Sequence, residues 1–164
     1  MNYSCQIISD NDDCVLLGNL LCSTGFTQNE SSFTKSIDNV ICTVSIISLS
    51  TTEKILVNND DDFIVYFDLS RPIRSTIDDF LNGNFHQNKC VFLLKSSSEN
   101  DSDNGDHVLL NKVYVLIKKF NFSLHIVDQD QFSSKLYDLI KDLSYRKYRS
   151  RPSNNVSCHR RNFT

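Results

Sequence analysis

The chain has 164 residues, of which 40% are hydrophobic and 23% charged, a composition typical of one folded domain. No stretch approaches the roughly 20 apolar residues of a membrane helix, and the first residues lack the features of a signal peptide, so we expect an intracellular protein. The four glycines never fall at the spacing of a phosphate-binding loop, which argues against a nucleotide site of that kind.

Charge is distributed unevenly along the chain. Residues 1–142 contain all 20 acidic side chains and 11 of the Lys and Arg residues, which gives a net charge of −9. Residues 143–164 contain no acid and have a net charge of +6, from Arg146, Lys147, Arg149, Arg151, Arg160 and Arg161. Basic tails commonly bind phosphate, so we predict that these six residues contact DNA. The alternative is a solvated end that keeps the protein soluble.

The first half of the sequence predicts a strand, a helix and then further strands. Cys5–Ile8 is a short apolar run, and Asp12-Asp13 offers an N-cap to an amphipathic helix that ends at Gly25. Alternating and β-branched residues predict strands at 33–37 and 40–49. Residues 55–57 either extend the second strand or pair with it. The fully apolar run 63–67 predicts a strand that is covered on both faces.

The second half continues this alternation of strands and helices. We predict a helix from Pro72 to Gly83, a buried strand at 90–94, and an exposed polar loop at 96–106. A helix at 109–120 and a strand at 123–127 follow. In the final helix, one apolar stripe should pack against the sheet, and it consists of Phe132, Leu136, Leu139, Ile140 and Leu143. The pattern predicts an α/β fold with a mostly parallel sheet flanked by helices, as a single domain over 1–150 with a basic disordered tail at 151–164.

Acidic residues follow several predicted strands, at the edge where α/β proteins bind ligands. They are Asp10, Asp12, Asp13, Asp68, Asp128 and Asp130. Such a cluster would suit Mg²⁺-dependent phosphoryl transfer of the receiver type, but that chemistry needs a lysine after the last strand, where this chain has Asp128. Aspartates at strand ends are also common helix caps. The histidines and cysteines form neither a nucleophile site nor a zinc pattern, so we expect no catalytic residue, metal or cofactor.

Three tyrosines of the final helix lie at helical spacing, away from its apolar stripe. They are Tyr137, Tyr145 and Tyr148. Aromatic residues are enriched both at the edges of a packed helix and in protein interfaces. We predict that these tyrosines form a partner interface, with intramolecular packing as the alternative.

The second half of the chain contains a series of segments that together resemble a known domain. They are FIVYFDLSRPIRSTIDDFL from Phe63, CVFLLK from Cys90, LLNKVYVLIKKF from Leu109, SLHIVD from Ser123 and FSSKLYDLIKDLSYRKYRSRP from Phe132. This series is similar to the central domain of the XPF-type nuclease superfamily. The likeness is greatest to its noncatalytic excision-repair subunits and their meiotic sporulation-sixteen relatives, and it covers about residues 4–152.

The resemblance implies a restriction-endonuclease-like domain that lacks the catalytic motif. Active XPF-type nucleases have an E-R-K-x-x-x-D run at a strand-to-helix corner, where this chain has Asp68-Leu69-Ser70-Arg71-Pro72. Glu and Lys are missing, so we expect no metal-dependent hydrolysis. The tandem helix-hairpin-helix domain that usually follows in this family has no counterpart in the twelve residues after Pro152.

The resemblance also implies a function in meiosis. It suggests the inactive subunit of a heterodimer with an XPF-like protein of the shortage-in-chiasmata type, which binds branched DNA weakly and through that partner. Such a subunit would promote crossover formation and synapsis on meiotic chromosomes in the nucleus. The rival hypotheses are an α/β adaptor without a nucleic-acid role and a divergent receiver-like phosphoryl-transfer domain.

Overall fold

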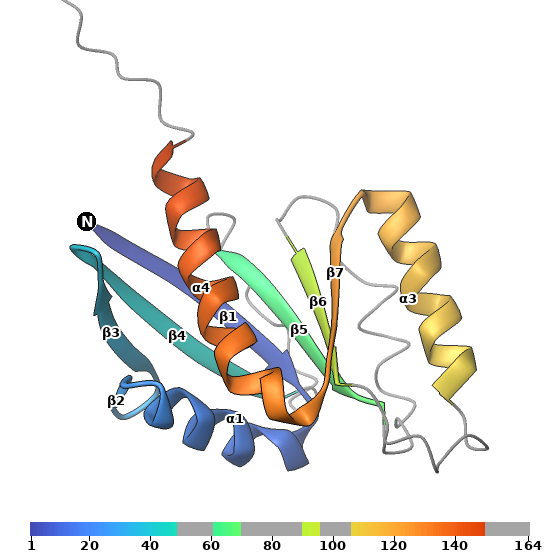
Figure 1. Ribbon diagram of the computed structural model, residues 1–164, viewed down its shortest axis with the longest axis horizontal. Coiled ribbons are helices and arrows are strands. Elements are labelled where there is room, and N and C mark those ends of the chain that lie inside the picture. The colour runs from blue at the N-terminus through green and yellow to red at the C-terminus, as the bar shows by residue number, and fades with distance from the viewer. Residues whose placement is uncertain (49–60, 70–89, 96–105, 150–164) are drawn as a thin grey trace, which may run out of the picture.

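The fold is built on one mixed β-sheet with helices on both faces (Figure 1). The computed structural model describes residues 1–48, 61–69, 90–95 and 106–149. Within them the strands are β1 (Asn2–Ser9), β2 (Thr27–Gln28), β3 (Phe33–Ile37), β4 (Val40–Ser48), β5 (Asp62–Asp68), β6 (Cys90–Lys95) and β7 (Ser123–Val127). Their order across the sheet is β2-β3-β4-β1-β5-β6-β7. The five strands from β4 to β7 in this order are parallel, and β2 and β3 form an antiparallel edge.

Helices cover the two faces of the sheet from opposite sides. On one face, α1 (Asn11–Ser23) and α4 (Phe132–Arg149) share a hydrophobic core with β1, β4 and β5. On the other face, α3 (Asp106–Phe120) contributes Val113 to a second core, which also contains Phe63 and Val65 of β5. A short 3-10 turn, η1 (Gln129–Gln131), leads from β7 into α4. Within the described residues, no helix is long and apolar enough to span a membrane.

The sequence of β5 explains its place near the centre of the sheet. Every residue from Asp62 to Asp68 is buried, because the strand has helices on both sides. Ile64 and Tyr66 face the core under α1 and α4, whereas their neighbours in sequence face the core under α3. The Tyr66 ring packs on Phe132 of α4, with 4.9 Å between ring centroids. The predicted strand with two covered faces is therefore confirmed.

Close packing at one glycine holds α1 against the antiparallel edge. Gly18 is buried in α1, and a Cβ atom at this position would lie 3.0 Å from Cζ of Phe33 in β3. Any larger side chain would therefore push the Phe33 ring aside. This contact accounts for a glycine inside a helix, where it otherwise costs about 1 kcal/mol relative to alanine.

The predicted fold class is confirmed: the protein is α/β, with a mostly parallel mixed sheet flanked by helices. Two local predictions were wrong: α3 begins at Asp106, inside the predicted loop and ahead of the predicted start at 109, and α1 also begins earlier than expected. Its N-cap is Asp10, whose carboxylate accepts a hydrogen bond from the Asn11 N–H at 2.7 Å, whereas Asp12 and Asp13 lie in the first turn. The predictions for 55–57, the helix from Pro72 to Gly83, residues 96–105 of the predicted loop and the tail at 151–164 lie outside the described residues.

Candidate interaction surface

The carboxyl ends of the parallel strands meet at one end of the sheet, where Asp68, one of the acidic strand-end residues, forms an ion pair. Asp68 ends β5 and pairs in register with Lys95, which ends β6. Nζ of Lys95 lies 3.2 Å from Oδ2 of Asp68, and the two side chains are 13% and 2% exposed. Receiver-type chemistry needs a lysine after the last strand, β7. Lys95 instead ends the neighbouring strand, β6, and its ammonium is already paired with Asp68.

The corner between β1 and α1 is short and acidic. Asp10 alone separates the strand from the helix, and the first turn of α1 contains Asp12 and Asp13. The buried Ser9 hydroxyl donates to the Asp10 carbonyl at 3.2 Å. A phosphate-binding loop at this position needs a glycine-rich turn and a lysine, and this corner has neither. Its aspartates would instead repel a phosphate group.

The acidic residues at the opposite end of β5 are also bonded within the chain. The buried Tyr3 hydroxyl donates to Oδ2 of Asp62 at 2.9 Å, and burial raises the pKa of Tyr3 above its ordinary value. Asp61 accepts hydrogen bonds from Ser4 and Gln6 of β1. These contacts fix the register of β5 against β1. In the described ranges, no group of three or more His, Cys, Asp or Glu residues is placed to hold a metal ion.

The predicted apolar stripe of the last helix is confirmed, and it determines which side of α4 faces solvent. All five stripe residues are buried in the core beneath α1 and α4. Three of the six predicted DNA-binding residues lie in the last turn of α4, namely Arg146, Lys147 and Arg149. The helix dipole also favours positive charge at this end. Arg146 and Arg149 are exposed, whereas the Lys147 ammonium lies 5.7 Å from the centre of the Tyr3 ring. Arg151, Arg160 and Arg161 lie outside the described residues.

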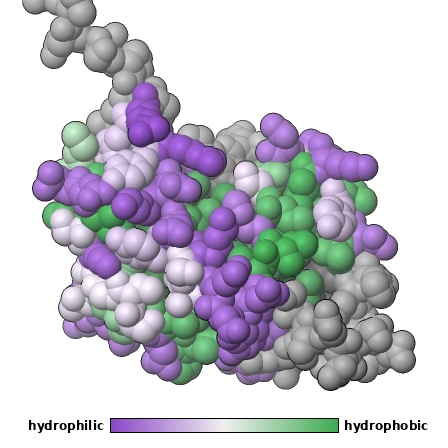
Figure 2. Space-filling view, viewed as in Figure 1, coloured by the Kyte–Doolittle hydropathy of each residue, from purple (hydrophilic) through white to green (hydrophobic). Residues whose placement is uncertain are grey.

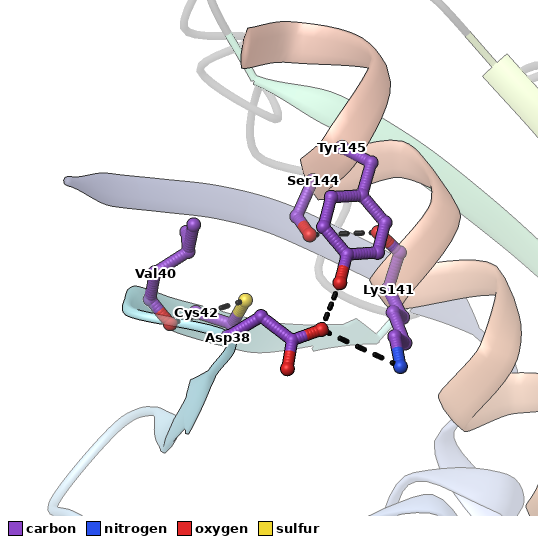
Figure 3. Close-up of polar contacts among 6 residues, drawn as sticks. All are labelled: Asp38, Val40, Cys42, Lys141, Ser144 and Tyr145. Atoms are coloured by element: carbon purple, nitrogen blue, oxygen red, sulfur yellow. Dashed lines mark hydrogen bonds and ion pairs between the residues drawn. The ribbon is translucent and has the colours of Figure 1, made fainter. Parts of the chain in front are cut away.

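The three tyrosines predicted as a partner interface attach α4 to β1, β3 and the β3–β4 turn. Tyr137 packs against the core, and Nζ of Lys35 lies 4.5 Å from its ring centre. The Tyr148 hydroxyl donates to the Asn2 carbonyl. The Tyr145 hydroxyl donates to Asp38 in the turn between β3 and β4, and Lys141 bridges to the same carboxylate at 3.5 Å (Figure 3). Each tyrosine is half-buried, so only part of its surface is accessible to a partner.

A second exposed region, which sequence reasoning missed, lies on β7 and α3. Ile126 of β7 is 52% exposed and Val115 of α3 is 64% exposed. Figure 2 shows hydrophobic side chains gathered over these two elements, beside the hydrophilic surface of α4. His125 of β7 lies toward α4, and its pKa is lowered by burial and by the nearby Lys135 and Arg146, which keeps the imidazole neutral at pH 7. The feature of the sequence that could have indicated this region is the predicted strand at 123–127, which contains no Asp, Glu, Lys or Arg.

Comparisons with known proteins show the fold and nothing finer. No family model matches the chain, and no curated protein matches it. The chain is similar to the crystal structure of a bacterial selenocysteine-specific elongation factor, with a TM-score of 0.54 and 13% identity over 89% of this chain and 29% of that one. It is also similar to a mutation variant of SsGBP, with a TM-score of 0.52 and 13% identity over 89% of this chain and 57% of that one.

The present chain therefore spans under a third of the elongation factor and little more than half of SsGBP. At this identity the likeness supports the α/β architecture alone. Neither protein is described as an XPF-type nuclease or as a meiotic protein.

Proposed function

We propose that this chain is a catalytically silent α/β subunit that acts by binding a partner protein. The observation that carries the proposal is the state of the edge where α/β proteins normally hold ligands. There Lys95 neutralises Asp68, and the β1–α1 corner offers aspartates in place of a phosphate cradle. Among the described residues, this pairing favours a scaffold over an enzyme, because Asp68 and Lys95 already bind each other.

In its specific form, the proposal follows the XPF-type resemblance. The chain would be the inactive half of a heterodimer with an XPF-like protein of the shortage-in-chiasmata type, and would promote meiotic crossover formation on branched DNA in the nucleus. Two features support this form: Asp68 stands where the nuclease motif would have its metal ligands, and exposed arginines gather at the end of α4. The rival form is an adaptor that binds a protein partner and no nucleic acid.

The first prediction concerns activity. We expect the purified chain to leave flap, fork and Holliday-junction DNA uncut in Mg²⁺ or Mn²⁺, because Asp68 is held by Lys95 and, within the described residues, belongs to no cluster of three or more potential metal ligands. We also expect no Mg²⁺-dependent labelling by a small phosphodonor. Both assays should include the Asp68→Asn variant. Metal-dependent cleavage or labelling that disappears in this variant would refute the proposal of a silent subunit.

The second prediction separates the heterodimer from the adaptor. If all six basic residues of 143–164 contact phosphates, the affinity of the chain for duplex DNA should fall with salt at a log–log slope of roughly −5. The net charge of −9 on residues 1–142 repels DNA, so we expect micromolar or weaker binding by the chain alone and tighter binding after co-purification with the XPF-like partner. Affinity for branched and linear duplexes should be measured at two salt concentrations.

A matched pair of variants tests the role of α4 in this binding. Changing the exposed Arg146 and Arg149 to serine should reduce the magnitude of the salt slope by about 2, since each phosphate contact contributes about 0.9. The control is Lys118→Ser, which removes an exposed charge from α3. An unchanged slope in the double variant, together with the absence of a complex with the XPF-like protein, would favour the adaptor.

A further inference from the structure

The two edges of the described sheet differ in how well they are protected from other strands. One edge is β2, which has only two residues, Thr27 and Gln28, both polar and exposed. The other edge is β7, which has five residues and pairs with β6 alone. Short polar edge strands discourage pairing with another chain, whereas long regular ones invite it.

The sequence of β7 contains none of the usual protections of an edge strand. Its residues, Ser-Leu-His-Ile-Val, include no proline and no Asp, Glu, Lys or Arg, and burial, together with the nearby Lys135 and Arg146, lowers the pKa of His125. Its register with β6 is continuous from Val91 and Ser123 to Lys95 and Val127, so no bulge interrupts it. Within the described residues, β7 therefore presents a regular row of backbone N–H and C=O groups along its outer edge.

Side chains on one face of β7 could pack against an added strand. Val127 faces the core under α1 and α4, so the alternation of a strand places Leu124 and Ile126 on the opposite face. Leu124 is half-buried against the core under α3, whereas Ile126 is 52% exposed. A neighbouring strand with an apolar residue opposite Ile126 would remove much of this surface from water.

The charges at the two ends of β7 have opposite signs. Lys118 is exposed in the last turn of α3, just before β7 begins, and Asp130 is exposed just after β7 ends. A strand that lies along β7 would therefore meet positive charge beside Ser123 and negative charge beyond Val127. Complementary charge at these ends sets the direction in which a partner strand lies.

We propose that β7 binds an extended segment of a partner protein, which adds to the sheet as an antiparallel strand. The segment has an apolar residue opposite Ile126, basic residues at its amino end beside Asp130, and acidic residues at its carboxyl end beside Lys118. Antiparallel pairing is slightly more stable than parallel pairing. This inference rests on the proposed function as a partner-binding subunit and names the surface involved. Strand addition of this kind obtains affinity from backbone hydrogen bonds and selectivity from alternate side chains.

The test uses the full chain and a short synthetic peptide with an alternating Thr–Val centre, lysines at its amino end and glutamates at its carboxyl end. We expect binding in a peptide titration and slower hydrogen exchange of the β7 amides. The control peptide has the same sequence with N-methyl groups at alternate positions, on the edge that would pair. If these groups block two backbone hydrogen bonds, affinity should fall about tenfold or more. Equal affinity of the two peptides, or no binding at about millimolar peptide, would overturn the proposal.

Two protein variants locate the binding site. Ile126→Lys places a charge on the β7 edge and should weaken peptide binding about tenfold, whereas Val115→Lys places the same charge on an exposed site of α3 and should leave binding unchanged. Equal weakening in both variants would contradict a β7 site. Self-association of the free chain that competes with the peptide would assign the edge to a second copy and overturn the proposal.

The same Ile126→Lys variant separates this proposal from the proposed function. Retained capture of the XPF-like protein by this variant would overturn the β7 site and leave the partner-binding function intact. Failure of the unmodified chain to capture that protein, with peptide binding intact, would instead count against the specific heterodimer.

Discussion

Replacing Lys95 with methionine is expected to destabilise the domain by about 3–5 kcal/mol, because it removes the ammonium that neutralises a nearly inaccessible carboxylate. Asp68 is 2% exposed, so water cannot take the place of Lys95 without opening the ends of β5 and β6. A loss of this size is a large part of the 5–15 kcal/mol that typically stabilises a domain. Urea unfolding of the two proteins measures the difference in free energy.

A second pair in the same molecule provides the control. Lys141 and Asp38 also form a Lys–Asp ion pair, at 3.5 Å, but their side chains are 36% and 55% exposed. Lys141→Met should therefore cost less than about 1 kcal/mol. The double variant Asp68→Leu, Lys95→Met should recover much of the loss, since it removes both partners of this buried pair. Equal effects of Lys95→Met and Lys141→Met would show that the Asp68–Lys95 pair is accessible to water in solution.

Truncating Ile140 to alanine should destabilise the domain by about 2–5 kcal/mol. Ile140 is fully buried in α4, among Leu136, Leu143 and the residues of β1 and β4 beneath it. The cost has two parts: the apolar area that is no longer buried and the cavity that the packed neighbours leave open. The matched control is Val115→Ala on the exposed face of α3, which should change stability by less than about 0.5 kcal/mol. A small effect at Ile140 would mean that α4 packs loosely on the sheet.

Sequence reasoning predicted the fold class because burial leaves periodic patterns along the chain. The apolar run 63–67 and the stripe from Phe132 to Leu143 were both found in the described core, on the faces expected. The N-cap of α1 was misplaced, since Asp10, Asp12 and Asp13 are chemically alike and only the backbone conformation at Asp10 distinguishes them. The same apolar runs arise in any parallel sheet, so they predict the architecture and not the XPF-type family.

The candidate site could be predicted only in part, because it depends on which strands become neighbours. Asp68 was noted as a strand-end residue, but its partner Lys95 is 27 positions away and their pairing follows from the order of β5 and β6. The exposure of Ile126 likewise follows from β7 being the last strand of the described sheet. No periodic pattern within one element carries this information. The intramolecular anchors of the tyrosines were not visible in the sequence, since Asp38 and Asn2 lie more than a hundred residues away from Tyr145 and Tyr148.

The position of β1 in the sheet affects how the protein folds while it is synthesised on the ribosome. This strand precedes the other described strands in the sequence, but it lies inside the sheet, with Cys5 paired in register with Val44 on one side and with Asp62 on the other. A nascent chain that has not reached β5 can therefore pair β1 on one side at most. Loops must close between distant segments before these contacts form, which slows folding and leaves apolar strands open to aggregation. Newly made copies should therefore be the ones that most need a chaperone, until α4 covers the sheet and Tyr148 reaches back to Asn2.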